Sequence, residues 1–379
     1  MAELTGLIDV KASESVTLEF KAAAYSRNDD GKKELLKDLT AFANTRGGLL
    51  VIGVAEQDNA AIAITPITRA EAEAERSRIN DLLRAGVDPR VFGVETKIIE
   101  VEGGVVLVVS IPRSAGRPHR VTSGHSNRFW LRNSTSAYEA DVGQLRALFL
   151  QSAEILEQAE AHHRERIPLI KNGDPLGNIA KEPDGLFLHI IPAEAFSGAP
   201  VVDPVQAQAI GHHFQPIASD GGYSPRFSFD GYMNFRGATP SYGYTLVRRN
   251  GIVEATKIKI GGGADFPADP TEVRLIQPTF RYAQGLLKLG VSPPFYAYAT
   301  LQGVKGRDLI SQYVSRYGDN MESPGRNVLH LPVAVLENAE SIDDVALAFR
   351  PAADAIWNAW GYACSPSYKD GKWTPAARE

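Results

Sequence analysis

The sequence predicts an α/β (α+β) N-terminal domain with a mixed sheet, followed by a second α+β domain. Three observations support this prediction. Residues 15–54 have the pattern strand, helix, strand. The later chain alternates strand pairs with helices. Between them, residues 168–184 are rich in Pro, Gly, Asp and Asn, which is typical of a boundary. We therefore expect domains at 1–166 and 185–379, joined by a linker at 167–184.

The first predicted strand covers 15–21, where apolar and polar residues alternate with the two-residue period of a half-buried strand. Apolar residues then recur at helical spacing up to Ala43, with Asp29 or Asp30 as the cap. The helix ends at Asn44–Gly48, and an all-apolar run follows at 49–54, typical of a buried strand. Because such crossovers join parallel neighbours, we expect these two strands to be parallel.

Further elements of the first domain follow from similar signals. A charged, Ala-rich helix is expected at 70–83. Strands at 94–101 and 105–111 flank a glycine turn and form a hairpin. A short strand is expected at 128–132, and a helix over 137–161 closes the domain.

The second domain begins with antiparallel sheet at 226–260, where Asn250-Gly251 is a strong hairpin signal. A helix at 270–289, strands at 295–302 and 327–337, and a helix at 342–363 follow. Trp357 and Trp360 on the last helix are expected in a core or an interface. A role in sensing, substrate binding or dimerisation is open for this domain. The adjacent histidines His162 and His163 are expected at the surface or at a cap.

Charge and composition exclude several classes of protein. The chain has 379 residues, and 40 Lys+Arg against 45 Asp+Glu give a net charge of −5. A uniformly basic protein is excluded, so any site for a polyanion must be local. The one cysteine forms no internal disulfide, which favours a reducing compartment. The start of the chain lacks a charged and then apolar leader, and no apolar run approaches the ~20 residues that cross a bilayer. We expect a cytoplasmic protein without a membrane segment.

An arginine-rich segment lies between Gly103 and Tyr138, where no acidic residue occurs. Interleaved basic and aromatic residues of this segment are Arg113, Arg117, His119, Arg120, His125, Arg128, Phe129, Trp130 and Arg132. Arginine interleaved with aromatic residues is typical of surfaces that hold phosphates and stack bases. The alternative is a surface loop whose arginines make scattered ion pairs.

Glu19 and Lys21 stand two residues apart on the first strand, so their side chains share a face. Metal-dependent nucleases use such a pair, the carboxylate for a divalent cation and the ammonium for a phosphate. If the first two strands are parallel neighbours, Glu56 lies at the same edge, where α/β sheets bind ligands. The alternative is a solvated strand face with a weak ion pair.

Ordered motifs carry a family resemblance. They are Glu14-Ser-Val-Thr-Leu-Glu19-Phe-Lys21, Ala41-Phe-Ala-Asn-Thr45-Arg-Gly47-Gly48, Val51-Ile-Gly53-Val54, Ser110-Ile-Pro-Arg-Ser114 and Arg128-Phe-Trp-Leu-Arg132. Over about residues 10–150 the chain resembles the Schlafen AlbA_2 domain family. In the Schlafen nucleases of this family, three acidic residues bind a divalent metal and cut tRNA or related RNA. The resemblance implies that these residues are Glu14, Glu19 and Glu56, with Lys21 assisting and Mg²⁺ or Mn²⁺ as the ion.

Two features of the implied site concern its geometry. Glu56 stands where family members usually have Asp, so its carboxylate is one methylene longer. On a straight strand Glu14 and Glu19 would be about 16 Å apart at ~3.3 Å per residue, too far for one metal. We therefore predict a turn or bulge around residues 13–16.

Taken together, the sequence predicts a Schlafen-like nucleic-acid-binding protein. We expect a metal-dependent endonuclease, that is, a hydrolase that acts on tRNA-like RNA or single-stranded DNA in defence or stress. The arginine segment is expected to bind this nucleic acid. In eukaryotic relatives two AlbA_2 lobes form a clamp, whereas this sequence shows one copy. We therefore expect a homodimer, whose two lobes would build an equivalent groove. Two alternatives stay open: a non-catalytic DNA- or RNA-binding regulator, and an ATP- or nucleotide-binding protein that uses the turn at Asn44–Gly48.

Overall fold

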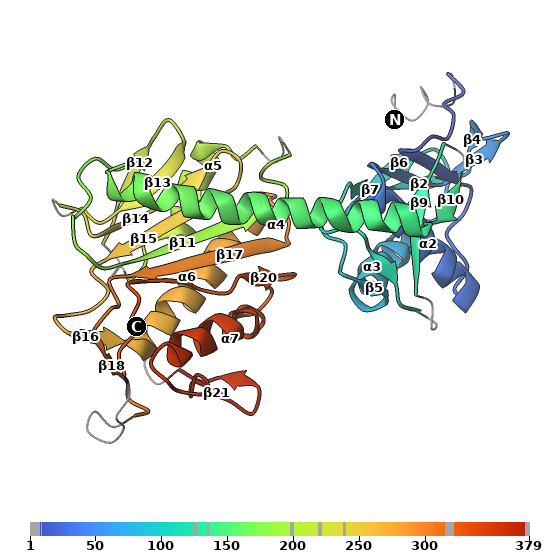
Figure 1. Ribbon diagram of the computed structural model, residues 1–379. Helices are drawn as coiled ribbons and strands as arrows, with labels where there is room; N and C mark the ends of the chain where they lie inside the picture. The colour runs from blue at the N-terminus through green and yellow to red at the C-terminus, as the bar shows by residue number, and fades with distance from the viewer. Residues whose placement is uncertain are drawn as a thin grey trace. The chain divides into compact units, whose positions relative to one another are not determined.

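The computed structural model describes residue 8 and residues 10–375, with gaps at 124–126, 135, 198–200, 219–221, 238–239 and 315–321. The chain divides into two compact units, Met1–Glu154 and Ile155–Glu379 (Figure 1). One helix, α4 (Val142–Lys171), belongs to the first unit up to Glu154 and to the second from Ile155 onward. The helix predicted at 137–161 therefore starts later and ends later than expected.

The first unit is built on a mixed four-stranded sheet with the order β1-β2-β7-β6. Its strands are β1 (Leu18–Lys21), β2 (Gly47–Ile52), β6 (Glu95–Val101) and β7 (Gly104–Pro112). β1 and β2 are parallel, as the strand–helix–strand pattern predicts, and β7 is antiparallel to both β2 and β6. The predicted glycine hairpin is confirmed, because Gly103 takes a φ of 84° between β6 and β7.

Smaller sheets flank this one. Their strands are β3 (Val54–Gln57), β4 (Ala60–Ile64), β5 (Val87–Asp88), β8 (Arg120–Val121), β9 (Arg128–Arg132) and β10 (Ala137–Glu139). β3 and β4 form a hairpin, and the other four follow the order β10-β9-β8-β5. The residues of β10 are expected in a helix from the sequence, but Tyr138 pairs with Leu131 of β9 and stays extended.

Two helices cover one face of the mixed sheet, α2 (Asp29–Asn44) and α3 (Arg69–Gly86). The cap of α2 differs from the expected Asp29 or Asp30, because Asn28 precedes the helix and its side chain accepts from Gly31 N at 2.9 Å. Helix α3 starts with a capping box between Thr68 and Glu71.

The core of the first unit lies between these helices and the sheet. Leu36 and Phe42 of α2 pack with Leu50 of β2 and Leu107 of β7. A smaller cluster on the other face contains Phe20, Val51, Val106 and the hairpin residues Val54 and Ala61. The hairpin β3–β4 is thereby held against β1, and this contact positions the acidic residues described below.

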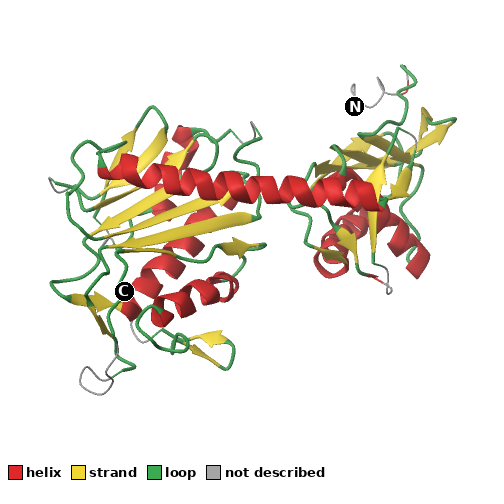
Figure 2. Cartoon of the chain, viewed as in Figure 1, coloured by secondary structure: helices red, strands yellow, loops and turns green. Residues whose placement is uncertain are grey.

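The second unit contains a large sheet, drawn in yellow in Figure 2. Its strand order is β12-β13-β14-β15-β11-β17-β19, and β20 also pairs with β17. Its strands are β11 (Gly185–Pro192), β12 (Ser224–Phe227), β13 (Gly231–Phe235), β14 (Gly243–Arg248), β15 (Val253–Ile258), β17 (Phe295–Gln302), β19 (Val328–His330) and β20 (Ala334–Leu336). The hairpin predicted at Asn250-Gly251 is confirmed between β14 and β15.

Two small strand pairs also belong to this unit: β16 (Asp265–Pro267) with β18 (Asp308–Ile310), and β21 (Tyr368–Lys369) with β22 (Lys372–Trp373). Its short helices are α5 (Pro204–Ala209) and η2 (Gly211–Phe214). The main helices are α6 (Ala268–Lys288) and α7 (Ile342–Asn358), close to the predicted ranges.

The large sheet has a different helix layer on each face (Figure 1). Leu188 of β11 and Ala299 of β17 pack in the cluster that includes α6 and α7, where Trp357 and Trp360 are buried as expected. On the opposite face, Phe187 of β11 packs with Ile167 and Ile170 of α4.

Packing on the sheet explains why α4 extends beyond its predicted end. Ile170 is fully buried, and Pro168 sits inside the helix without ending it. Packing of an apolar face contributes most of a helix's stability, and here it offsets the missing N–H of the proline. His163, expected at a surface or cap, is 2% exposed on this face, which corrects that expectation. In the described part of the chain, no helix is long and apolar enough to span a membrane.

Candidate nucleic-acid interface and acidic site

A tight turn before β1 brings Glu14 back to the strand. Ser15 N donates to Leu18 O at 3.0 Å, and Leu18 N donates to Ser15 O at 3.3 Å. Beyond this turn the Glu14 carboxylate accepts from Phe20 N at 3.1 Å. The chain is not a straight strand from Glu14 to Glu19, so the turn predicted at 13–16 is present, centred slightly later.

Glu56 lies on the hairpin that is joined to the Glu14 segment. Its carboxylate accepts from Asn59 N at 3.0 Å, across the hairpin turn. Asn59 O in turn accepts from Glu14 N at 2.6 Å, and Ala12 O accepts from Ala61 N at 3.0 Å. Backbone hydrogen bonds therefore place the tip of the β3–β4 hairpin beside the residue that precedes the turn.

Glu19 lies between two cationic side chains. Lys21 Nζ contacts one carboxylate oxygen at 2.5 Å, and Arg132 donates to the other. Arg132 also donates to Ser15 O at 3.0 Å and to Leu18 O at 3.3 Å, so it spans the turn. Its guanidinium lies 4.6 Å from the centre of the Phe42 ring, and its side chain is 1% exposed. The structure thus places Arg132 inside the unit, on Glu19.

The electrostatics of Glu14 link the acidic residues. Burial raises the pKa of Glu14, the hydrogen bond from Phe20 N opposes this, and the charges of Glu19 and Glu56 raise it further. Although burial lowers the pKa of Lys21, its contact with Glu19 raises it overall. Glu14 is therefore within electrostatic reach of both Glu19 and Glu56, and Lys21 stays protonated beside Glu19.

Carboxylates are hard oxygen donors, the chemical type that Mg²⁺ and Mn²⁺ prefer. Glu14, Glu19 and Glu56 fit such an ion in donor chemistry. In the arrangement described, Glu19 is engaged by Lys21 and Arg132, and among the described residues no three acidic, His or Cys side chains form a metal-binding group.

The arginine segment supplies a separate group of cations. Arg113 is exposed, and Arg117 is half-buried close to it. Arg117 donates to two neutral acceptors, Ser114 O at 2.8 Å and Gln151 Oε1 at 2.7 Å. Burial lowers the pKa of Arg117, and the charge of Arg113 lowers it further. These two guanidinium groups repel each other, and the acceptors of Arg117 are neutral, which favours a bound anion.

The strands β8 and β9 carry further members of the segment. Arg120 pairs with Asp88 at 2.8 Å, and exposed Arg128 lies 3.6 Å from Glu139. The Arg128 guanidinium is also 5.9 Å from the centre of the half-buried Trp130 ring. Solvent-exposed ion pairs of this kind contribute little stability, so both arginines can exchange a carboxylate for a phosphate.

His119 is the predicted contact residue that lies deepest in the fold. It is 0% exposed, its Nδ1 is 2.7 Å from Pro89 O, and burial lowers its pKa to about 4. Asn44, the last residue of α2, bonds His119 N, His119 O and Trp130 O at 2.6–3.0 Å. These contacts connect α2 to the strands β8 and β9, and they fix the backbone near Arg120 and Arg128.

The glycine turn after α2 is filled by protein. A Cβ on Gly47 would lie 2.5 Å from Arg113 N, and one on Gly48 would lie 2.4 Å from Thr17 O. Both glycines are needed for close backbone packing. The nucleotide-binding alternative requires a phosphate at this turn. The packed surroundings of the turn do not favour one there.

Comparisons with known proteins agree with the expected family. Residues 14–141 match the family model described as Schlafen, AlbA_2. The prediction of that family for the first part of the chain is confirmed. No curated protein is a significant match to the chain.

Two solved structures are similar over 37% of this chain. One is the DIP2311 protein of Corynebacterium diphtheriae, at 18% identity and a TM-score of 0.26, with the match covering only 26% of that chain. The other is the N-terminal domain of a RecG-related protein of Nitrosomonas europaea, at 17% identity and a TM-score of 0.28, with 92% of that chain covered.

Proposed function

We propose that the first unit binds RNA or DNA through the cationic surface formed by Arg113, Arg117, Arg120 and Arg128, with Trp130 as a stacking platform. The observation that carries this proposal is the pair Arg113 and Arg117, whose charges are close and whose hydrogen-bond acceptors at Arg117 are neutral. A phosphate would relieve their repulsion. The Schlafen AlbA_2 match over residues 14–141 supports a nucleic acid as the polyanion.

The test is a binding titration of the full chain with labelled tRNA and single-stranded DNA over a series of salt concentrations. We expect the double variant Arg113→Ala, Arg117→Ala to bind more weakly. Its plot of log affinity against log salt should be flatter, by about 0.7 for each single-strand phosphate that the variant no longer neutralises. Arg76→Ala is the control, because exposed Arg76 lies on α3, outside the arginine segment, and pairs with Glu73. Equal losses of affinity in the two variants would contradict the proposal.

Metal-dependent cleavage of the bound strand is the second candidate function. The observation that favours it is the electrostatic coupling of Glu14 to Glu19 and to Glu56, whose charges raise the pKa of Glu14. We propose these carboxylates as the ligands of Mg²⁺ or Mn²⁺, which when bound would supply charge stabilisation at the phosphoryl oxygens. The protonated Lys21 lies beside Glu19 and can hold a phosphate oxygen.

Cleavage is tested by incubating tRNA and single-stranded DNA with the full chain and either ion. Glu56→Gln is the sharpest variant, because Glu56 is exposed and a glutamine can still accept from Asn59 N. Products that disappear in Glu56→Gln and Glu19→Ala would support the enzyme. Binding without products from the wild type would support the non-catalytic regulator. A homodimer stays a prediction, and a monomeric mass by light scattering with full binding would contradict it.

A further inference from the structure

Buried histidines lie between α4 and the large sheet of the second unit. His163 of α4 and His189 of β11 are 2% and 0% exposed. Their Nδ1 atoms are 2.8 Å apart, so one ring donates to the other. Two buried imidazoles joined in this way form the centre of a longer chain of hydrogen bonds.

The outer half of this chain reaches the surface through a threonine. His163 Nε2 is 2.7 Å from Thr300 Oγ1, and that hydroxyl is 2.9 Å from His330 Nδ1. Thr300 is fully buried, whereas His330 is exposed. The two residues are register partners on β17 and β19, so the sheet itself fixes their contact.

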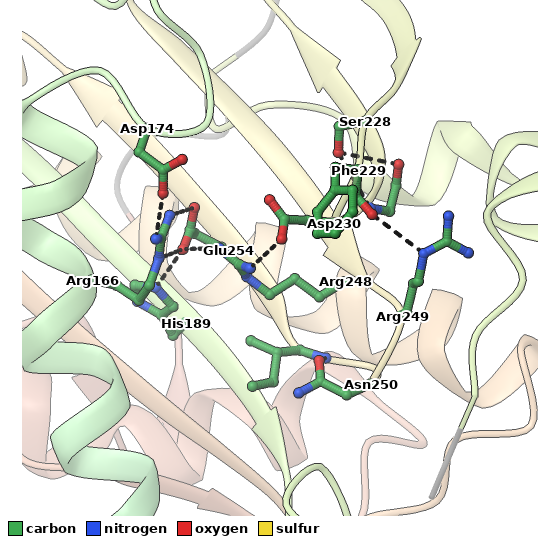
Figure 3. A network of polar contacts seen from close by, with 12 residues as sticks. Arg166, Asp174, His189, Ser228, Phe229, Asp230, Arg248, Arg249, Asn250 and Glu254 are labelled. Carbon is green, nitrogen blue, oxygen red and sulfur yellow. Dashed lines mark hydrogen bonds and ion pairs between the residues drawn. The ribbon is translucent and has the colours of Figure 1, made fainter. Parts of the chain in front are cut away.

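The inner half ends on a buried carboxylate (Figure 3). His189 Nε2 is 3.3 Å from Glu254 Oε2, again between register partners, on β11 and β15. Arg166 binds both oxygens of Glu254, at 2.7 and 3.1 Å, and Arg248 contacts one at 3.3 Å. Burial by itself would raise the pKa of Glu254, but the hydrogen bonds of His189 and Arg166 and the charge of Arg248 hold it well below its usual range.

An ionised Glu254 determines which atom donates and which accepts in each hydrogen bond between Glu254 and His330. Because a carboxylate only accepts, His189 carries its proton on Nε2, and a neutral His189 accepts at Nδ1. His163 then donates from Nδ1 and accepts at Nε2 from Thr300. The threonine oxygen accepts in turn from His330 Nδ1. The outermost ring therefore keeps an unprotonated Nε2.

Neutral rings agree with the surrounding charges. Two arginines already contact Glu254, so its charge is compensated before a histidine is protonated. Burial lowers the pKa of His163 to about 2 and that of neighbouring His162 to about 4. Burial and the charge of Arg164 also lower the pKa of His330, while Glu160 opposes them.

A cavity of about 460 Å³ opens beside His330, at the outer end of this chain of hydrogen bonds. It is within the range of small-molecule sites. Its polar lining includes His163, Tyr298, His330, Glu160 and Arg164, and its apolar wall includes Leu156, Leu331 and Val333. Glu160 and Arg164 form an ion pair at 2.5 Å on the α4 side. A ligand with an apolar ring and one O–H donor fits this combination.

We propose that this cavity is a second site, which binds a small phenol-like molecule as a hydrogen-bond donor to His330 Nε2. The series of hydrogen bonds through Thr300 and His163 leaves this nitrogen as an acceptor. The ligand keeps its proton, because the two arginines on Glu254 already compensate the charge at the inner end. This proposal is independent of nucleic-acid binding by the first unit.

The first test reads the ring protons directly, by two-dimensional ¹H–¹⁵N NMR of the full chain labelled at histidine. We expect His330 with its proton on Nδ1, His163 on Nδ1 and His189 on Nε2 at neutral pH. Thr300→Val, which keeps the shape but removes the hydroxyl, should change the His330 pattern and leave that of His189. His330→Ala assigns the outer signal at an exposed position. A proton on Nε2 of His330 in the wild type, or an unchanged His330 in Thr300→Val, would overturn the assigned directions of the hydrogen bonds.

The second test uses 4-nitrophenol as the probe, because its absorbance distinguishes phenol from phenolate. We expect the wild type to hold bound probe as the phenol at a pH where the free probe is the phenolate. His330→Ala should lose this shift, and Thr300→Val should reduce it. Leu347→Ala, at an exposed position of α7, is a control expected to behave as the wild type. Bound phenolate with the wild type, or an equal shift with His330→Ala, would overturn the assigned ligand class.

Discussion

Replacing Arg132 by Met is the most informative change in the first unit. The guanidinium donates to the Glu19 carboxylate and to the carbonyls of Ser15 and Leu18, and it lies on the Phe42 ring. A methionine fills the volume of the stem and removes the charge and the donors. The turn that returns Glu14 to the strand thereby loses its buried cross-link.

The expected loss of stability follows from the burial of Glu19, which is 7% exposed. Removing one partner of a buried ion pair costs about 3–5 kcal/mol, because the remaining charge is left uncompensated. Lys21 still contacts Glu19, and its side chain is 28% exposed. We therefore expect the lower end of that range, about 3 kcal/mol.

Hydrogen exchange followed by mass spectrometry is the suitable assay, since a chain of two units has no single free energy of unfolding. Peptides that cover 15–21 and 47–52 should exchange about 100-fold faster in Arg132→Met, as every 1.4 kcal/mol is about a factor of ten. A peptide over 295–302 in the second unit should exchange at the wild-type rate and serves as the internal control.

The double variant Glu19→Gln, Arg132→Met separates charge from packing. It removes the carboxylate that the single variant leaves uncompensated, so we expect it to recover part of the protection. A single variant within about 1 kcal/mol of the wild type, or a double variant no better than the single one, would refute the role assigned to the pair.

Three further changes test the surroundings of the site. Burial raises the pKa of Glu14 above its ordinary 4.5, so its ionised form destabilises the folded state. Glu14→Gln should therefore slow hydrogen exchange at β1 at neutral pH. This gain in stability should vanish below pH 4.5, where the wild-type carboxyl is protonated in both the folded and the unfolded state. Asn44→Ala should destabilise β8 and β9 by about 1–3 kcal/mol by leaving the backbone of His119 without its partner, and it should weaken RNA binding in a titration. Thr68→Ala should cost about 1 kcal/mol at the start of α3 and leave RNA binding unchanged, measured by the same exchange and titration experiments.

Elements of the first unit follow from the sequence wherever the signal is local. The parallel pairing of β1 with β2 follows from the strand–helix–strand order, and the β6–β7 hairpin follows from Gly103 and Gly104. The turn before β1 follows from a distance argument about Glu14 and Glu19, because the resemblance requires both at one site. Local periodicity does not reveal where α4 ends, since Pro168 is overridden by packing against a distant strand.

The fate of individual charged residues could not be deduced in this way. Arg128 and Arg132 belong to one five-residue strand, and two-residue periodicity gives them the same face. One is exposed and the other is buried on Glu19, a residue 113 positions earlier in the chain. His163 and Glu254 in the second unit are a similar case, because their burial depends on strand register across the large sheet. Long-range partners decide these outcomes.

The surroundings of Glu19 also bear on the choice between binding and cleavage. A divalent cation gains most from carboxylates whose charge is not already compensated, and Glu19 contacts both Lys21 and Arg132. An ion at Glu14, Glu19 and Glu56 therefore competes with two cations of the protein. Binding through Arg113 and Arg117 requires no such exchange. We expect the affinity for tRNA to stay the same when Mg²⁺ is replaced by a chelator at constant ionic strength. An affinity that falls on chelation would show that the acidic site takes part in binding itself.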